Sequence, residues 1–114
     1  MERCFEDLEV WKRSKCLAVE VYRALGDCKD WGFKDQITRA ALSVPSNIAE
    51  GAERLTPNEF VQFLGYAKGS LGELRTQMMI GGELGYLPDA LVDRWIHESR
   101  ELSRMVVGLV RSLR

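Results

Sequence analysis

Four stretches of the sequence repeat apolar residues at the spacing of an α-helix, and this periodicity limits the chain to a helical fold. The predicted helices span about 7–25, 33–54, 57–84 and 88–113. No stretch shows the apolar–polar alternation that is typical of a half-buried strand. Short connections between long helices favour antiparallel neighbours. The sequence therefore predicts an all-α, up-down-up-down antiparallel four-helix bundle that forms one domain, residues 1–114.

The third predicted helix carries the clearest local signals. Thr56-Pro57-Asn58-Glu59 fits a capping box, with Thr56 at the N-cap and Glu59 at the third helical position. Each glycine inside a helix costs up to about 1 kcal/mol relative to alanine. We expect the glycines of this helix to allow the close approach of a neighbouring backbone; they are Gly65, Gly69, Gly72, Gly81 and Gly82.

The first two predicted helices each have one unusual feature. Two adjacent apolar stripes, one through Tyr22 and one through Val21, give the first helix a broad apolar face that should contact more than one neighbour. A cyclic assembly would bury the excess. Pro45 lies inside the second helix, but the apolar spacing continues from Ala41 to Ile48. We therefore expect a kinked, continuous helix there.

Composition and charge weigh against several classes of protein. The chain has 16 Lys and Arg against 17 Asp and Glu, a net charge of −1, whereas nucleic-acid binders usually show a basic excess. No stretch approaches the roughly 20 apolar residues that span a bilayer. The first residues, MERCFEDLEV, carry charges where a secretory signal has its apolar core. These features predict a cytoplasmic protein.

Residues that could bind a metal or cofactor are sparse. The three cysteines, Cys4, Cys16 and Cys28, lie 12 residues apart and form no close pair. His97 is the one histidine, and it lies in no Glu-x-x-His motif. We therefore expect no metal site, no cofactor and no small-molecule substrate.

Two sets of polar residues border apolar stripes. On the second helix Ser43, Asn47, Glu50 and Arg54 share one face, and on the third helix Ser70 and Glu73 share another. If these helices pack together, Asn47 and Glu50 could meet Ser70 and Glu73 at a partly buried seam. One interpretation is a catalytic pair of carboxylates, Glu50 and Glu73. The other is a polar network that fixes helix register or subunit packing, and the absence of an accompanying nucleophile or metal ligand favours it.

Basic residues concentrate on the first and last predicted helices. They are Lys12, Arg13, Arg100, Arg104 and Arg111. If these two helices are neighbours, the basic residues could form a stripe that contacts nucleic-acid phosphates. The alternative is an ordinary charged surface, because acidic residues such as Glu98 and Glu101 lie among them.

Two blocks of sequence resemble a known family. Ser43-Val44-Pro45-Ser46-Asn47-Ile48-Ala49-Glu50-Gly51, followed by Arg54, resembles the S-[IV]-x-x-N-I-A-E-G-x-x-R signature of bacterial four-helix-bundle proteins. These are also called 23S ribosomal RNA intervening-sequence proteins. The block Ala67-Lys68-Gly69-Ser70-Leu71-Gly72-Glu73-Leu74 is also similar to the family. The resemblance extends over roughly residues 5–110.

The resemblance implies an up-down bundle that assembles into a ring-shaped homopentamer without enzymatic activity. A distantly similar accessory protein of diversity-generating retroelements associates with a reverse transcriptase and nucleic acid. The polar residues named above are then signature positions of the family. We therefore expect a non-enzymatic oligomeric scaffold that associates with ribosomal or other RNA, or with a nucleic-acid-bound protein. The alternative is a protein–protein interaction module with no nucleic-acid contact.

Overall fold

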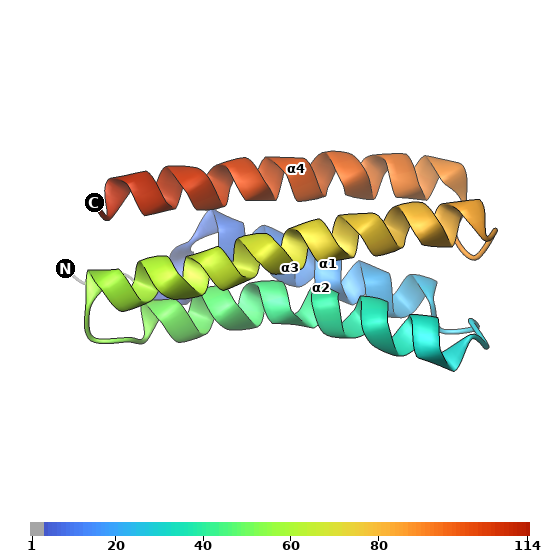
Figure 1. The fold of residues 1–114 in the computed structure, drawn as a ribbon, viewed down its shortest axis with the longest axis horizontal. Helices are drawn as coiled ribbons and strands as arrows, with labels where there is room; N and C mark the ends of the chain where they lie inside the picture. The colour runs from blue at the N-terminus through green and yellow to red at the C-terminus, as the bar shows by residue number, and fades with distance from the viewer. Residues whose placement is uncertain (1–3) are drawn as a thin grey trace.

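The computed structural model describes residues 4–114, and these residues form four long helices and no strand (Figure 1). A short 3-10 helix, η1 (Phe5–Asp7), is followed by α1 (Glu9–Ala24), α2 (Trp31–Ala52), α3 (Pro57–Glu83) and α4 (Asp89–Ser112). Residues 1–3 of the predicted domain lie outside the described residues. The all-helical fold predicted from periodicity is confirmed.

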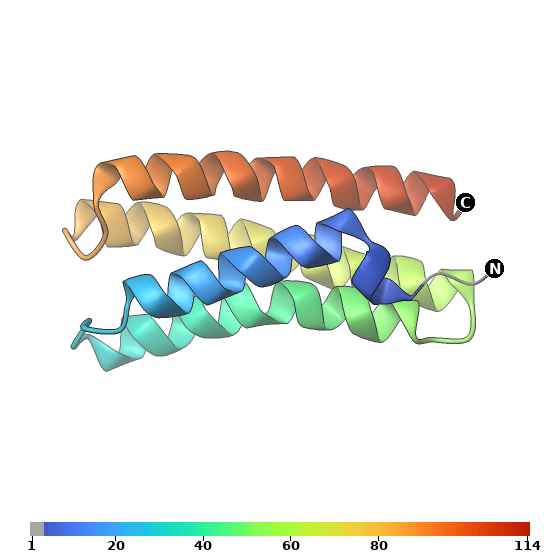
Figure 2. The same cartoon turned by 180° about the vertical axis from the view of Figure 1, so that it is seen from behind.

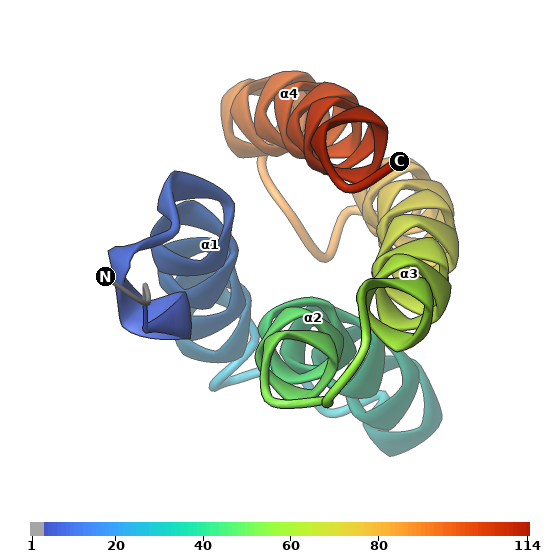
Figure 3. The same cartoon turned by 90° about the vertical axis from the view of Figure 1, so that its left-hand side faces the viewer.

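The helices form an elongated antiparallel bundle that measures 46 × 22 × 20 Å. Seen along the bundle, the helices follow one another around the core in chain order, so that α2 lies between α1 and α3 (Figure 3). Seen from behind, α1 lies between α2 and α4 (Figure 2). Each helix therefore has two neighbours and one outward face.

The core consists of aliphatic side chains from all four helices and one indole. Trp95 on α4 is the largest buried side chain, 1% exposed. On α1 the buried face runs through Val10, Leu17 and Val21, whereas Tyr22 is 45% exposed. The second apolar stripe predicted for this helix is therefore only partly used by the bundle.

The helix starts follow from capping side chains. Asp30 Oδ1 accepts a hydrogen bond from the Phe33 backbone N–H at 3.1 Å, so α2 begins at Trp31 rather than at 33. Thr56 Oγ1 accepts from the Glu59 backbone N–H at 3.2 Å, which confirms the predicted N-cap of α3. The Thr56 hydroxyl also donates to Glu59 Oε1 at 2.9 Å.

Inside α2 and α3, the prediction for Pro45 is confirmed and the prediction for the glycines is not. α2 continues through the buried Pro45 without a break, as predicted. The expected close approach at Gly65, Gly69 and Gly72 is wrong within residues 4–114, because a Cβ added at any of them would meet nothing within 4 Å. The close backbone approach lies instead at Gly51, where an added Cβ would be 3.3 Å from the Phe60 carbonyl oxygen.

The other two glycines of α3 face side chains rather than backbone. A Cβ at Gly81 would lie 2.9 Å from atoms of both Phe33 and Leu87, and one at Gly82 would lie 3.2 Å from Val92. α3 then ends at a turn in which Gly85 has a φ of +76°, a conformation that favours glycine. Across the described residues, no helix is long and apolar enough to cross a membrane.

Candidate functional site

The family-signature residues of α2 lie along its seam with α3. The guanidinium carbon of Arg54 lies 4.8 Å from the centre of the Phe63 ring, and Gly51 packs on the same phenylalanine. These contacts fix which face of α2 packs on α3 and how the two helices are aligned along the bundle axis. Arg54 itself lies just past the end of α2, which was predicted to extend to residue 54. Counted back in turns from Gly51, Asn47 and Ser43 follow the side of α2 that packs on α3, and Glu50 lies next to Gly51.

The half-buried members of this set bond to their own helix. Ser43 Oγ donates to the Ala40 carbonyl oxygen at 2.8 Å, and Asn47 Nδ2 donates to the Ser43 carbonyl oxygen at 2.8 Å. Among the described residues, no hydrogen bond joins Ser70 or Glu73 to α2. Ser70 and Glu73 are therefore not joined to the α2 members of the predicted network, whose contact with α3 comes from Arg54.

The predicted meeting of Glu50 with Glu73 is wrong. Glu50 pairs with Arg54 at 3.1 Å, and Arg54 also approaches Glu59 at 3.9 Å. Gly51, next to Glu50, packs on Phe63. Glu73 lies ten residues farther along α3, about 15 Å along its axis. Glu50 and Glu73 are therefore too far apart for their two carboxylates to share catalytic work.

Gln77, two turns beyond Ser70 on the same side of α3, is a polar residue that the bundle leaves unsatisfied. Its Oε1 is buried and accepts no hydrogen bond from residues 4–114. A buried acceptor without a donor is rare because the loss of hydration is not offset.

Arg13 and Lys12 do not form the predicted basic stripe. Arg13 Nε donates to Glu98 Oε2 at 3.0 Å, a second nitrogen binds Glu98 Oε1, and a third lies 3.4 Å from the sulfur of Met105. The hydrogen bond to Glu98 raises the pKa of the Arg13 guanidinium. Lys12 lies 3.8 Å from Glu9. Arg13 is therefore a cross-link between α1 and α4 rather than a free cation.

Further polar contacts join the same two helices. Glu20 on α1 accepts from the Trp95 indole at 3.1 Å and pairs with Arg94 at 2.9 Å. A groove of about 380 Å³ runs between the helices beside these contacts, and both Cys16 and His97 line it. Three cations, Lys12, Arg13 and Arg94, and two carboxylates, Glu20 and Glu98, line this groove, and each of these cations has an acidic partner. In the described part of the chain, no three residues are grouped as a metal site would need.

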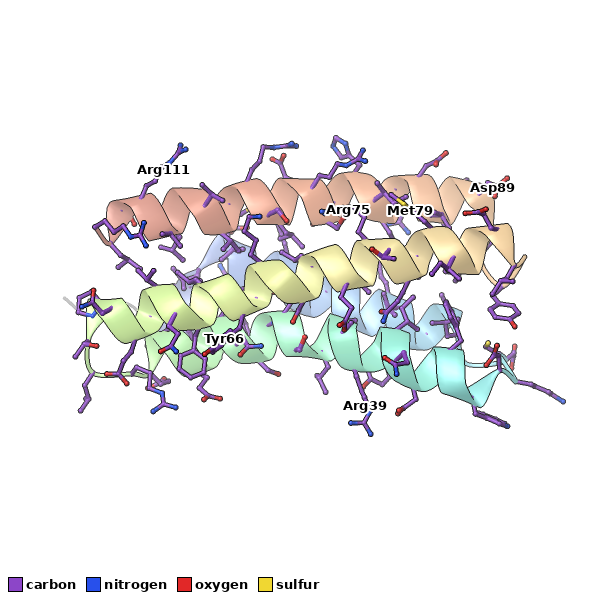
Figure 4. All side chains as sticks on the ribbon, viewed as in Figure 1. Arg39, Tyr66, Arg75, Met79, Asp89 and Arg111 are labelled. Carbon is purple, nitrogen blue, oxygen red and sulfur yellow. The ribbon has the colours of Figure 1, made fainter. Side chains whose placement is uncertain are left out.

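Three cations surround a second hollow, between α3 and α4. Arg104 and Arg111 from α4 line it together with Lys68 from α3, and its volume is about 380 Å³. Ser103, Val107 and Gly108 form the rest of the lining, so no carboxylate borders it. Arg111 points away from the bundle on the outer side of α4 (Figure 4). We call this feature the basic hollow.

The cations of the basic hollow are only partly neutralised. Arg104 pairs with Glu101 at 2.9 Å, and this hydrogen bond lowers the pKa of the Glu101 carboxyl. Within residues 4–114, Lys68 and Arg111 have no ion-pair partner, nor does Arg100, one turn before Arg104 on α4. Of the predicted basic residues, Arg100 and Arg111 thus stay unpaired within residues 4–114, whereas Lys12 and Arg13 have acidic partners.

Lys68 is not among the basic residues predicted from the sequence to contact nucleic acid. It lies among the exposed glycines of α3, and its place depends on how α3 and α4 are aligned. Two contacts set that alignment: Arg75 Nη1 donates to Ser99 Oγ at 3.3 Å, and Val92 packs where a Gly82 side chain would be. Helical periodicity gives the face of each residue but not this alignment.

Known proteins resemble the chain in both sequence and fold. The sequence matches the family described as 23S rRNA-intervening sequence protein over residues 6–108. No curated protein matches it. A crystal structure of a protein with unknown function, from the S23 ribosomal protein family of Bacteroides thetaiotaomicron VPI-5482, is similar at a TM-score of 0.82 and 20% sequence identity. The similarity covers 89% of this chain and 97% of that one.

The two findings have different weight. The structural neighbour is too distant in sequence to carry more than the fold, whereas the family match spans nearly the whole chain and includes the Ser43–Arg54 signature. The chain belongs to the 23S rRNA-intervening sequence protein family.

Proposed function

We propose that this protein is a non-enzymatic, oligomeric helical scaffold in the cytoplasm that associates with RNA. The observation that carries the RNA association is the basic hollow, where Lys68 and Arg111 stay unpaired within the described residues although the chain has a net charge of −1. Unpaired cations grouped on one surface attract phosphates even when the whole protein is nearly neutral. The family's name, which refers to 23S rRNA, agrees with this assignment.

The outer face of α3 supports assembly into a homopentameric ring. Tyr66 and Ile80, four turns apart on α3, are 50% and 44% exposed on that face, and Leu84, one turn after Ile80 at the end of the helix, is 56% exposed. Tyr66 lies over the seam between α3 and α2 (Figure 4). The unsatisfied Gln77 oxygen and the exposed Glu73 are on the same side of α3. A neighbouring copy on this face would bury the exposed apolar side chains.

Light scattering on a size-exclusion column tests both parts of the proposal. Five copies of the 13.0 kDa chain have a mass of about 65 kDa. We expect this mass in buffer, a larger mass after addition of total cellular RNA, and a return to the smaller mass in high salt. A 13.0 kDa species at micromolar concentration would contradict the assembly.

A pair of matched variants locates the assembly surface. Ile80→Glu places a charge on the outer face of α3, and we expect it to give monomers. Val19→Glu changes a similarly exposed residue, 42% against 44%, on α1, and we expect it to leave the mass unchanged. If both variants keep the wild-type mass, the outer face of α3 is not the interface.

The alternative function is a protein–protein interaction module without nucleic-acid contact. The exposed apolar side chains of α3 favour it, because an exposed apolar surface commonly marks a binding site for protein. An assembly whose mass ignores RNA at low salt would support this function over the scaffold for RNA.

A further inference from the structure

We infer that the basic hollow between α3 and α4 binds the phosphodiester backbone of RNA, without reading its sequence. The inference rests on the proposed RNA association and adds the surface, the contacting residues and the chemical group that they bind. Lys68 contributes an ammonium group from α3, and Arg104 and Arg111 contribute guanidinium groups from α4. Arg100 extends the row by one turn along the same face.

The spacing of these cations suits a polyphosphate rather than a single anion. Arg100 and Arg111 are eleven residues apart on α4, about 16 Å along the helix axis. One strand of a duplex carries a phosphate about every 3.4 Å along its axis, so the row is long enough to face several phosphates. Lys68 stands across the hollow from this row, on the neighbouring helix.

The floor of the hollow leaves room for a strand. A Cβ added at Gly108 would meet nothing within 4 Å, and Ser103 and Val107 are the only uncharged side chains of the lining. No carboxylate lines the hollow to repel phosphates, and the nearby Glu101 is already paired with Arg104. A phosphate backbone can therefore reach the cations without displacing packed residues.

The lining also explains why binding would be independent of sequence. Proteins that hold the bases of a single strand stack them on aromatic side chains, and no aromatic residue lines this hollow. Cations that contact phosphates position the strand but read no base edges. We therefore expect homopolymers of different base composition to bind with affinities within about threefold of each other.

Charge-matched double variants test the site by fluorescence anisotropy with a labelled 20-nucleotide RNA of mixed sequence. Lys68→Gln/Arg111→Gln removes two charges from the hollow. Lys29→Gln/Arg39→Gln removes two charges from exposed residues elsewhere. Arg39 points away from α2 on the side of the molecule opposite α4 (Figure 4). We expect the first variant to bind at least about tenfold more weakly at 50 mM salt and the second to bind as the wild type does.

The salt dependence supplies a second readout. Four phosphate contacts, those of Lys68, Arg104, Arg111 and Arg100, at about 0.7 each predict a loss of about 50-fold in wild-type affinity between 50 and 200 mM salt. The hollow variant, with two contacts left, should lose only about sevenfold over the same range. Equal slopes for the wild type and the hollow variant would contradict the assignment of these contacts.

Gly108 allows a test that leaves every cation in place. Gly108→Glu and Gly108→Gln add side chains of the same shape into open space, so both should fold and melt alike by circular dichroism. We expect the glutamate variant to bind RNA at least about tenfold more weakly than the glutamine variant, because only the glutamate repels phosphates.

The results of these experiments distinguish a failure of the proposed site from a failure of the proposed RNA association. If the wild type binds RNA and the hollow and Gly108 variants bind equally well, this site is wrong and the RNA association stands on another surface. If the wild type binds no RNA at 50 mM salt, both the site and the RNA association are overturned. Weaker binding confined to the hollow variants supports both.

Discussion

The carboxylate of Glu20 on α1 accepts a hydrogen bond from the indole nitrogen of Trp95 on α4, with 3.1 Å between Oε1 and Nε1. Trp95 is 1% exposed, so few other acceptors can reach its N–H group. The same carboxylate pairs with Arg94 at 2.9 Å. Glu20 therefore has two roles at the seam between α1 and α4: it satisfies a buried donor and it neutralises a surface cation.

Two variants of Glu20 separate these roles. Glu20→Gln keeps an acceptor for the indole and loses only the exposed ion pair, so the free energy of unfolding should fall by less than about 1 kcal/mol. Glu20→Ala leaves the buried N–H without a partner and should cost about 1–3 kcal/mol. Urea unfolding measures both values. Equal losses would mean that the ion pair with Arg94, not the indole hydrogen bond, stabilises the seam.

A second long-range contact predicts a pH dependence of stability. Tyr86, in the α3–α4 turn, donates its hydroxyl hydrogen to Asp30 Oδ2 at 2.7 Å. This bond lowers the pKa of the Asp30 carboxyl and raises the pKa of the Tyr86 hydroxyl. The stabilisation is present above the ordinary Asp pKa of about 4 and is lost as the pH falls through the lowered value. It is also present below the ordinary Tyr pKa of about 10 and is lost as the pH rises through the raised one.

The variant Tyr86→Phe removes this bond and keeps the edge-to-face contact of the ring with Phe33, whose centroid is 5.3 Å away. We expect a lower urea midpoint than in the wild type between about pH 4 and pH 10, and a smaller difference outside that range. The helix cap that Asp30 provides is present in both proteins and cancels in the comparison. A difference that stays constant from pH 3 to pH 11 would contradict this account.

Local signals in the sequence predict the helices but not the alignment between them. Apolar periodicity and the Thr56 cap locate four helices close to their observed bounds, because both depend on residues within one or two turns. The alignment of α2 with α3 along the bundle axis depends instead on the packing of Gly51 against Phe63. For this reason the sequence led to the wrong prediction that Glu50 and Glu73 meet.

The basic residues also show that sequence patterns do not predict contacts between helices. The sequence grouped Arg13 with the arginines of α4, because a bundle of this topology makes α1 and α4 neighbours. The structure pairs Arg13 with Glu98 and brings Lys68 beside Arg104 and Arg111. Side-chain contacts between helices decide which cation forms an ion pair and which stays unpaired. The residue pattern of a single helix does not predict these contacts.

The N-cap of α3 makes a prediction about a single side chain. Thr56→Ala removes the acceptor for the Glu59 N–H and should lower the free energy of unfolding by about 1 kcal/mol. Thr56→Ser keeps the hydroxyl and should stay close to the wild type. Thermal or urea unfolding of the two variants gives the comparison. If the alanine variant is as stable as the serine variant, the cap contributes nothing measurable to the fold.

The glycines of α2 and α3 predict opposite effects for the same substitution. Gly51→Ala places a Cβ 2.7 Å from the Cβ of Phe63 and 3.3 Å from the Phe60 carbonyl oxygen. Because α3 must move to relieve these contacts, we expect a loss of about 1–3 kcal/mol in the free energy of unfolding. In the monomer, Gly69→Ala adds a Cβ that meets nothing within 4 Å, so the higher helix propensity of alanine should raise the free energy of unfolding of the monomer by about 0.5–1 kcal/mol.

Unfolding of both glycine variants should be followed in urea at a protein concentration where the wild type is monomeric or at several concentrations. A subunit that packs closely on the outer face of α3 would reverse the sign for Gly69→Ala, since the added Cβ would then meet the neighbouring copy. A gain in stability that does not change with concentration would instead mean that no backbone approaches α3 at Gly69, and that these glycines are not part of a subunit interface.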